Sequence, residues 1–192
     1  MEYNTPRLET ERLVLRRFTP ADLEALFRLM DDPVVNTFLP WFPLETRAEA
    51  ANLLQSRYLD FYRRPSGYRW AVCLREADTP IGYVHLDDGE AHDLGYALAR
   101  PFWGCGYAVE AVSAAVGRLR TDGIPFVTAT HDADNPRSGA VMARTGMTYR
   151  YSYRELWQPK NRWITFRMYQ MDLNGSWPDY RGYWNSWPLH WV

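Results

Sequence analysis

The stretch LGYALARPFWGCGYAVEA, residues 94–111, decides the fold of this chain. It starts as a β-strand that ends at Leu98, continues through Gly104 and Gly106, and takes up helical spacing of apolar residues from Tyr107. The strand is therefore followed by a glycine-bearing loop that leads into the start of a helix. Glycine lets consecutive backbone N–H groups turn to one side, and the helix dipole adds about half a positive charge there. Such a junction is suited to binding a phosphate or diphosphate group.

Two glycines alone do not distinguish between kinds of phosphate site. A dinucleotide site requires a third Gly or Ala three residues after Gly106, inside a parallel β-α-β unit near the start of the domain. This chain has Val109 at that position, and the strand before the loop belongs to an antiparallel series. A tight turn before a helix, without a ligand, is the structural alternative.

Strands and helices are expected on both sides of this junction. Alternating apolar residues predict strands over 12–18, 68–75, 80–86, 93–98, 126–131, 147–154 and 163–171. Helical spacing and capping signals predict helices over 19–32, 46–64, 107–119 and 135–146. The order β-α-α-β-β-β-α-β-α-β-β predicts an α+β fold with a mixed, mostly antiparallel central sheet flanked by helices.

Bulk composition is that of an ordinary globular protein. The chain has 192 residues, 46% of them apolar and 23% charged, so a single core is expected. A formal net charge of -1 favours neither nucleic acid nor an anionic membrane as a partner. No apolar run approaches the roughly 20 residues of a membrane span, and residues 1–12 lack the apolar segment of a signal peptide.

Cysteine usage and the C-terminal segment add two expectations. The two cysteines, Cys73 and Cys105, lack metal-ligand spacing, so we expect a cytoplasmic protein without a metal ion. Of the nine tryptophans, four crowd into the last sixteen positions: Trp177, Trp184, Trp187 and Trp191. Because tryptophan favours burial, we divide the chain into a domain, 1–173, and an aromatic tail, 174–192. The tail is expected to pack on its own domain or on a partner subunit, as a homodimer contact or as a cover on the acceptor site.

Several motifs in the chain match one family. They are WGCGYA at 103–108, NPRS at 135–138, MARTGM at 142–147, ETERLVLR at 9–16 and FLPW at 38–41. The first is similar to the Q/R-x-x-G-x-G/A cofactor motif of the GNAT superfamily of N-acetyltransferases. The others resemble segments of the branch that includes the ribosomal-protein N-terminal acetyltransferases, which are the RimJ/RimL-like enzymes.

This resemblance implies a GNAT-like fold, an acyl donor and a set of site residues. Acetyl-CoA would be the donor, and its binding residues would be Tyr96, Ala97, Leu98, Trp103, Gly104, Cys105, Gly106, Tyr107, Ala108, Asn135 and Ser138. The backbone N–H of Leu98 would donate to the oxyanion, and Ser138 would face the sulfur. Ser138 would also replace the tyrosine acid of many members, because Met142 stands in its place. Phe38 and Trp41 would border the acceptor.

Acetyl transfer to an amine requires a neutral amine, a stabilised oxyanion and a proton for the leaving thiolate. The base that neutralises the amine stays open among two groups of residues. One group follows a strand and the other surrounds a hairpin: His131, Asp132 and Asp134, and His85, Asp87 and Asp93.

The sequence thus predicts an acetyl-CoA-dependent N-acetyltransferase that transfers the acetyl group directly to a primary amine. That amine would belong to a protein N-terminus, another peptide or a small molecule. Two alternatives remain at this point. The donor could be another thioester, such as succinyl-CoA, or the chain could be a CoA-binding regulatory module without turnover.

Overall fold

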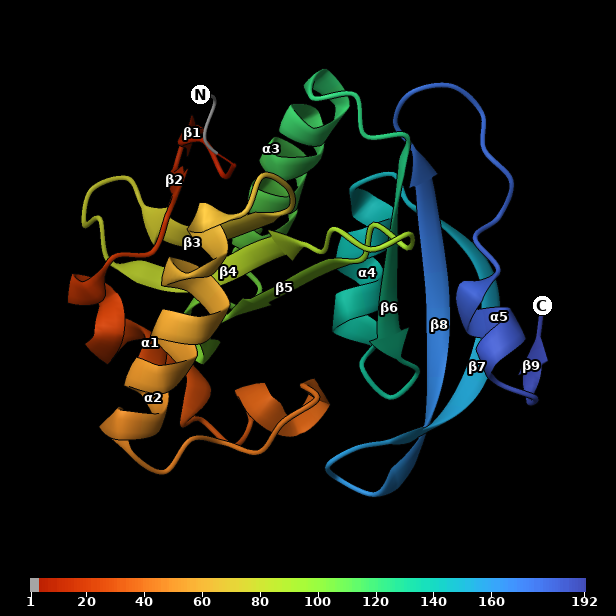
Figure 1. Cartoon of the computed structure of the whole chain (residues 1–192), viewed down its shortest axis with the longest axis horizontal. Coiled ribbons are helices and arrows are strands. Elements are labelled where there is room, and N and C mark those ends of the chain that lie inside the picture. Colours follow the sequence, from red (N-terminus) through yellow and green to blue (C-terminus); the bar gives the residue numbers. More distant parts are fainter. Residues whose placement is uncertain (1–3) are drawn as a thin grey trace.

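Two β-sheets lie side by side, and helices cover them (Figure 1). The computed structural model describes residues 4–192. The first sheet has the strand order β1-β2-β3-β4-β5, and the second has the order β6-β8-β7-β9. Pairings within both sheets are antiparallel. A parallel bridge between Asp93 and Thr128 links the two sheets.

The elements follow the chain with short connections. The first sheet contains β1 (Leu8–Glu9), β2 (Leu13–Arg16), β3 (Tyr68–Leu74), β4 (Pro80–Leu86) and β5 (Leu94–Leu98). The second sheet contains β6 (Phe126–Asp132), β7 (Thr148–Trp157), β8 (Arg162–Asp172) and β9 (His190–Trp191). The α-helices are α1 (Leu23–Met30), α2 (Arg47–Leu54), α3 (Tyr107–Thr121), α4 (Pro136–Arg144) and α5 (Gly182–Ser186). Short 3₁₀ turns occupy Pro20–Asp22, Val35–Phe38, Phe61–Arg63 and Arg100–Phe102, and a π turn, Gln55–Leu59, extends α2.

Local capping signals place the two early helices. The backbone N–H of Glu49 donates to the Thr46 hydroxyl at 3.2 Å, which is the capping box predicted for α2. Before α1, the backbone N–H of Thr19 donates to the Asp22 carboxylate at 2.7 Å, and a 3₁₀ turn precedes the α-helix. The α2 helix therefore begins where the sequence predicts, whereas the segment predicted to start the first helix at Thr19 forms a 3₁₀ turn and α1 begins at Leu23.

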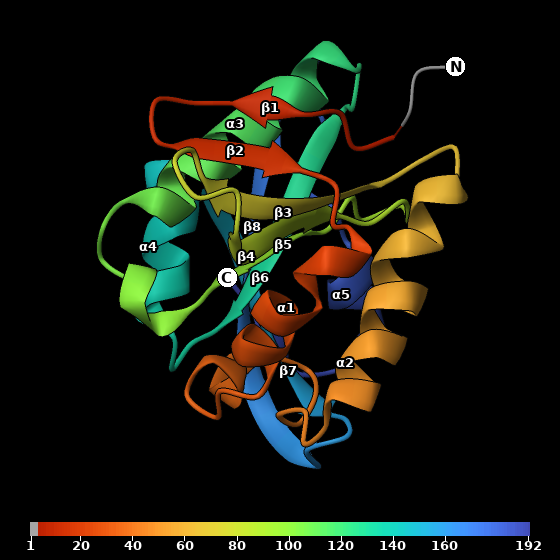
Figure 2. The same cartoon turned by 90° about the vertical axis from the view of Figure 1, so that its left-hand side faces the viewer.

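Strand alternation divides the first sheet into two packed faces. Trp70 and Val72 of β3 point into a core that also contains residues of α3 and α4. Ala71 and Cys73, on the opposite face of the same strand, contact the cluster formed with α1 and α2. Figure 2 shows α1 and α2 on one side of this sheet and α3 on the other.

The segment 174–192 packs on the second sheet of its own chain. Within it, β9 pairs with β7, and the Tyr151 hydroxyl donates to the Tyr180 carbonyl oxygen at 2.6 Å. Aromatic rings of the segment also cover this sheet, because Tyr183 stacks on Tyr153 and Trp184 meets Tyr151 edge to face. In Figure 1, α5 lies in front of β7 and beside β8.

The predicted α+β class is confirmed, with one difference in detail. We expected one central sheet, but the strands form two sheets because β5 and β6 touch through the Asp93–Thr128 bridge and then diverge. The described part of the chain, residues 4–192, also contains no helix with the length and apolar character that crossing a membrane requires.

Candidate active site

One edge of β5 is left without a strand partner in the described structure, beyond the bridge at its start. The N–H of Ala99 donates to the carbonyl oxygen of Ile81 on β4 at 2.8 Å. Antiparallel pairing alternates the direction of backbone groups, so the N–H groups of Tyr96 and Leu98 point to the other edge, toward β6. The middle of β5, residues 95–97, is partly exposed although both ends of the strand are buried.

The two strands separate from a defined point. At that point the Thr128 N–H donates to the His92 carbonyl oxygen at 3.2 Å, and the Thr128 hydroxyl donates to the Ala91 carbonyl oxygen at 2.8 Å. From there β5 and β6 run in diverging directions (Figure 1). The free edge of β5 therefore faces the side of the first sheet from which β6 diverges.

The loop after β5 is shaped by two glycines with left-handed backbone. Gly104 has a φ of +75° and Gly106, the N-cap of α3, has a φ of +82°. Residues with a Cβ atom rarely adopt these angles. Gly104, Cys105 and Gly106 are all exposed. The first N–H groups of α3, beginning at Tyr107, have no acceptor within the helix. The loop thus presents backbone donors at the positive end of a helix dipole.

An arginine that our sequence analysis did not single out secures this loop. Arg12, just before β2, donates to the Cys105 carbonyl oxygen at 3.0 Å and forms a 2.6 Å ion pair with Glu110 of α3. Its guanidinium also lies over the Tyr107 ring, 4.5 Å from the ring centroid. Arg12 belongs to the segment 9–16 and Glu110 to the segment 94–111, but their pairing depends on how β2 packs beside α3.

Trp103 joins the loop to the strand. Its indole Nε1 donates to the Leu98 carbonyl oxygen at 2.6 Å, and its ring packs against the clusters on both faces of the first sheet. The Arg137 guanidinium lies 5.7 Å from the centroid of this ring. Trp103 therefore holds both the loop and the last peptide of β5 in place.

Tyr96, Asn135 and Ser138 come together where α4 begins. The Tyr96 hydroxyl donates to the Ser138 carbonyl oxygen at 2.7 Å and lies 3.0 Å from the Ser138 hydroxyl oxygen. The Asn135 side chain accepts the Ser138 N–H at 3.4 Å, as an N-cap. Burial raises the pKa of Tyr96, so its hydroxyl remains protonated. Met142, one turn further along α4, is buried in the core.

The predicted acceptor-side residues lie between α1 and α2. Phe38 ends a 3₁₀ turn there and is partly buried. The Trp41 ring lies under the Arg57 guanidinium at 4.6 Å, and its buried indole N–H has no hydrogen-bond partner among residues 4–192. Lys160, in the β7–β8 connection, donates to the Asn36 carbonyl oxygen at 2.5 Å. The β7–β8 connection of the second sheet thus reaches this loop.

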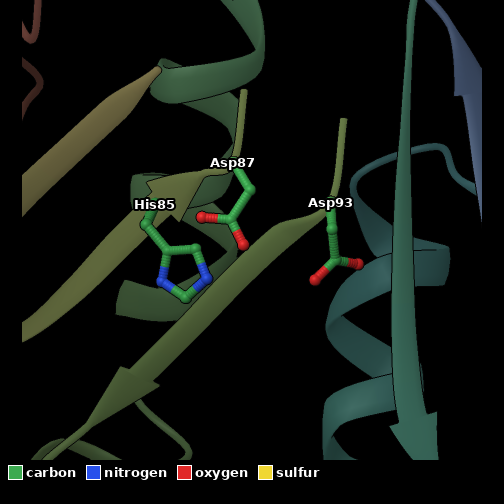
Figure 3. Close-up of side chains that lie close together, drawn as sticks. All are labelled: His85, Asp87 and Asp93. Carbon is green, nitrogen blue, oxygen red and sulfur yellow. The ribbon is translucent and has the colours of Figure 1, made fainter. Parts of the chain in front are cut away.

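Three titratable side chains meet beside the start of β5 (Figure 3). His85, Asp87 and Asp93 place one donor atom each within 4.8 Å of one another. Arg69 pairs with Asp87, and the Tyr183 hydroxyl donates to Asp93 Oδ1 at 3.3 Å. Burial and then the Asp87 carboxylate raise the pKa of Asp93 to about 7. Burial and then Arg69 lower the pKa of His85, which keeps the imidazole neutral.

The other group of base candidates lies elsewhere. His131 is buried at the end of β6 with its ring against Gly139 of α4, and the His131 Nδ1 lies 2.7 Å from the Asp132 carbonyl oxygen. Burial lowers the pKa of His131. The buried Asp132 carboxylate accepts the Asp134 N–H at 3.0 Å and lies 3.7 Å from Arg162. These residues therefore belong to the far end of β6, whereas the Asp93 cluster flanks the start of β5.

The Asp93 cluster also has the donor atoms that a divalent metal ion uses. However, both carboxylates already have partners in the protein, because Arg69 pairs with Asp87 and Tyr183 donates to Asp93. A raised carboxyl pKa beside a neutral histidine is instead typical of groups that accept and release protons near pH 7.

A strand with a free edge, a glycine loop and a helix N-terminus thus follow one another in this fold. The chain belongs to the GNAT acetyltransferase family, because the family model for the acetyltransferase (GNAT) domain matches residues 12–148. Among curated relatives it is 27% identical over 146 residues to the uncharacterized N-acetyltransferase YoaA of Bacillus subtilis. That match covers 73% of this chain and 82% of YoaA.

Solved structures share the fold at lower identity. A GNAT-family acetyltransferase from Bacillus anthracis is 20% identical with a TM-score of 0.76, covering 87% of this chain and 98% of that one. RimL, a ribosomal L7/L12 α-N-protein acetyltransferase in complex with coenzyme A, is 18% identical with a TM-score of 0.76. That match covers 89% of this chain and 100% of RimL. MccE, a microcin C7 self-immunity acetyltransferase in complex with acetyl-CoA and AMP, is 16% identical with a TM-score of 0.74. That match covers 85% of this chain and 93% of MccE.

Proposed function

We propose that this acetyltransferase uses acetyl-CoA as its donor and transfers the acetyl group directly to a primary amine with a pKa near 8. One observation carries the proposal. The free edge of β5 runs from the glycine loop, where backbone donors collect, to Asp93, whose pKa is raised to about 7. A diphosphate site and a proton acceptor thus stand at opposite ends of one strand.

The loop fits the diphosphate of a CoA thioester. Backbone amides of residues 104–108 are the donors, and the +75° and +82° angles of Gly104 and Gly106 turn them outward. The position of a Gly104 Cβ has no atom within 4 Å, so a ligand can approach the backbone closely. Trp103 and Cys105 shape the loop, and Asn135 at the start of α4 is suited to bind an amide of the pantetheine arm.

The amides of Leu98 and Tyr96 are suited to the rest of the donor. A pantetheine arm that leaves the loop along β5, beside Ala97, meets the Leu98 N–H first and the Tyr96 N–H second. At about 3.3 Å per residue, Asp93 lies about 17 Å from Leu98 and about 10 Å from Tyr96. Because Tyr96 is nearer to Asp93, its backbone amide is a second candidate, in addition to that of Leu98, for the donor to the oxyanion. Water would then lie between the amine and Asp93.

The leaving thiolate requires a proton, and Ser138 is suited to supply it. The Ser138 hydroxyl lies 3.0 Å from the Tyr96 hydroxyl, which remains protonated because burial raises its pKa. In the proposed reaction the amine nitrogen forms a bond to the acetyl carbon and the carbon–sulfur bond breaks. Ser138 gives its proton to sulfur and regains one, by way of water, as the substituted nitrogen loses its second proton. The Tyr96 hydroxyl, 3.0 Å away, orients the Ser138 side chain.

The proton of the ammonium group goes to Asp93. A base with a pKa of about 7 accepts a proton from an α-ammonium of pKa near 8 at a cost of roughly 1.4 kcal/mol, but from a lysine near 10.4 only at roughly 4 to 5 kcal/mol. This difference supports an α-amine, such as a peptide or protein N-terminus, or a small molecule of similar basicity. Phe38 and Trp41 lie on the side from which such an acceptor would enter.

Two measurements test the proposal. Calorimetric titration with acetyl-CoA, succinyl-CoA and free CoA should show binding of all three through the shared diphosphate. Release of free thiol should then follow with acetyl-CoA and an N-terminal peptide amine, and be slower with a matched peptide whose only amine is lysine. CoA binding without thiol release across an amine panel would contradict the transferase and favour a binding module. Absence of CoA binding would remove the whole proposal.

A further inference from the structure

We propose that Tyr183, which the C-terminal segment 174–192 supplies, is a positioning residue for the Asp93 carboxyl group in acetyl transfer. The inference rests on the proposed function, since it assigns a role to a residue that acts through the proposed base. It gives the aromatic segment a part in the reaction.

The contact bridges the two sheets. Asp93 precedes β5 of the first sheet, whereas Tyr183 belongs to α5, which is anchored on β7 of the second sheet. The hydroxyl of Tyr183 donates to Asp93 Oδ1 at 3.3 Å. This hydrogen bond lies beside the Asp93–Thr128 bridge, where the sheets touch before they diverge. Tyr183 therefore reaches Asp93 from the second sheet.

The Tyr183 ring has a defined orientation. It stacks on Tyr153 of β7 with a centroid distance of 5.3 Å and an interplanar angle of 4°, and Tyr180 contacts it edge to face at 5.4 Å. Burial, followed by the nearby Asp93 charge, raises the pKa of Tyr183, so the hydroxyl keeps its proton and acts as a donor. A fixed donor holds the Asp93 Oδ1 oxygen, and in the proposed reaction the other oxygen accepts the proton.

The charged and titratable groups around Asp93 come from four elements. They are His85 of β4 and Asp87 directly after that strand, Arg69 of β3, Tyr153 of β7, and Tyr180 and Tyr183 of the C-terminal segment. Asp87 opposes ionisation of Asp93, whereas Arg69 and the Tyr183 hydrogen bond favour it. A donor to the charged form lowers a carboxyl pKa, so loss of the Tyr183 hydroxyl should make Asp93 retain its proton to higher pH.

The test compares Tyr183→Phe with the wild-type protein across pH. Phenylalanine retains the ring that stacks on Tyr153 but cannot donate to Asp93. We expect the ratio of kcat/KM in the variant to that in the wild type to fall about threefold to fivefold at pH 6 and to return to near one at pH 9, because the apparent pKa rises by roughly half a unit or more. The ionisation of the amine cancels in this ratio.

Tyr151→Phe is the matched control. It removes another tyrosine hydroxyl hydrogen bond to the same segment, the 2.6 Å bond to the Tyr180 carbonyl oxygen, without touching Asp93. Its ratio to wild type should be independent of pH. A flat ratio in Tyr183→Phe, or an equal pH-dependent shift in both variants, would overturn the inference, since either result would give the hydroxyl of Tyr183 no specific effect on the base.

A second readout does not require turnover. Carbon NMR of aspartate carboxyl groups, with Asp93→Asn used for assignment, should show Asp93 titrating near pH 7 in the wild type and at higher pH in Tyr183→Phe. Unchanged titration would refute the inference even if no acceptor is found. Failure of the proposed function would look different, because the wild-type protein itself would then transfer no acetyl group.

Discussion

The indole Nε1 of Trp103 lies 2.6 Å from the carbonyl oxygen of Leu98, and this hydrogen bond closes the turn between β5 and α3. The N–H of Leu98 belongs to the free edge of β5, along which the pantetheine arm is proposed to lie. Trp103 thereby links the shape of the diphosphate loop to the position of the strand beside it.

Trp103→Phe should weaken donor binding. Phenylalanine retains most of the packing but cannot donate to the Leu98 carbonyl, and a hydrogen bond of this kind is worth roughly 0.5 to 1.5 kcal/mol. We expect the dissociation constant for acetyl-CoA, measured by calorimetry, to rise about twofold to tenfold. Trp163→Phe is the matched control, because Trp163 is an exposed residue of β8. Equal effects of the two substitutions would contradict the role of Trp103.

Alanine substitution of a loop glycine should change stability and CoA affinity differently from alanine substitution of a helical glycine. Alanine at Gly104 has space but must adopt a φ of +75°, which costs roughly 1 kcal/mol. Gly104→Ala should therefore lower both the free energy of unfolding and the affinity for CoA. Gly117→Ala, in the middle of α3 with open space around it, should raise stability by up to about 1 kcal/mol and leave affinity unchanged. Chemical denaturation and calorimetry measure the two quantities, and the same sign for both variants would refute the difference.

Ser138 and Tyr96 should affect the rate more than binding. Ser138→Ala removes the proposed proton donor, and Tyr96→Phe removes the hydroxyl that lies 3.0 Å from it. We expect kcat to fall about tenfold to a hundredfold in Ser138→Ala and less in Tyr96→Phe, while the dissociation constant for acetyl-CoA changes less than threefold. Steady-state kinetics and calorimetry separate the two effects. An unchanged kcat in Ser138→Ala would remove this residue from the mechanism.

Asp93→Asn should remove the acidic limb of the pH profile. Burial and the Asp87 carboxylate raise the pKa of Asp93 to about 7, so wild-type kcat/KM should rise with pH through about 7 as the base loses its proton. Asparagine accepts no proton, and we expect activity at pH 7.5 to fall at least tenfold, with no inflection near pH 7. A variant that keeps the wild-type profile would show that another group is the base.

Ionisation of the same carboxyl group should lower the stability of the folded protein, although it raises the activity. Its pKa is about 7 in the folded protein and near 3.8 otherwise, so the folded state binds a proton that the unfolded chain has lost between about pH 4 and pH 7. The contribution is therefore complete below about pH 4 and is lost as the pH rises through about 7. Asp93→Asn should raise Tm relative to wild type more at pH 8 than at pH 4.5. Thermal unfolding followed by circular dichroism measures this, and a pH-independent difference would contradict it.

Local sequence patterns were sufficient for most of the elements. The Thr46–Glu49 capping box, the Gly104 and Gly106 loop and the start of α3 at Tyr107 all depend on neighbours within a few residues. The separation of one sheet into two could not be predicted in this way. It depends on where the β5 and β6 backbones stop pairing, and period-2 alternation is the same on either side of that point.

The sequence by itself determined the α+β class, the order of the main elements and the strand–loop–helix junction, because periodicity, caps and glycines act over short distances. The tertiary structure alone decided which of six candidate bases has a raised pKa beside β5, and which residues support it. Asp93 and Tyr183 are 90 positions apart. Their contact depends on how α5 packs against the second sheet and how that sheet meets the first, which local spacing does not encode.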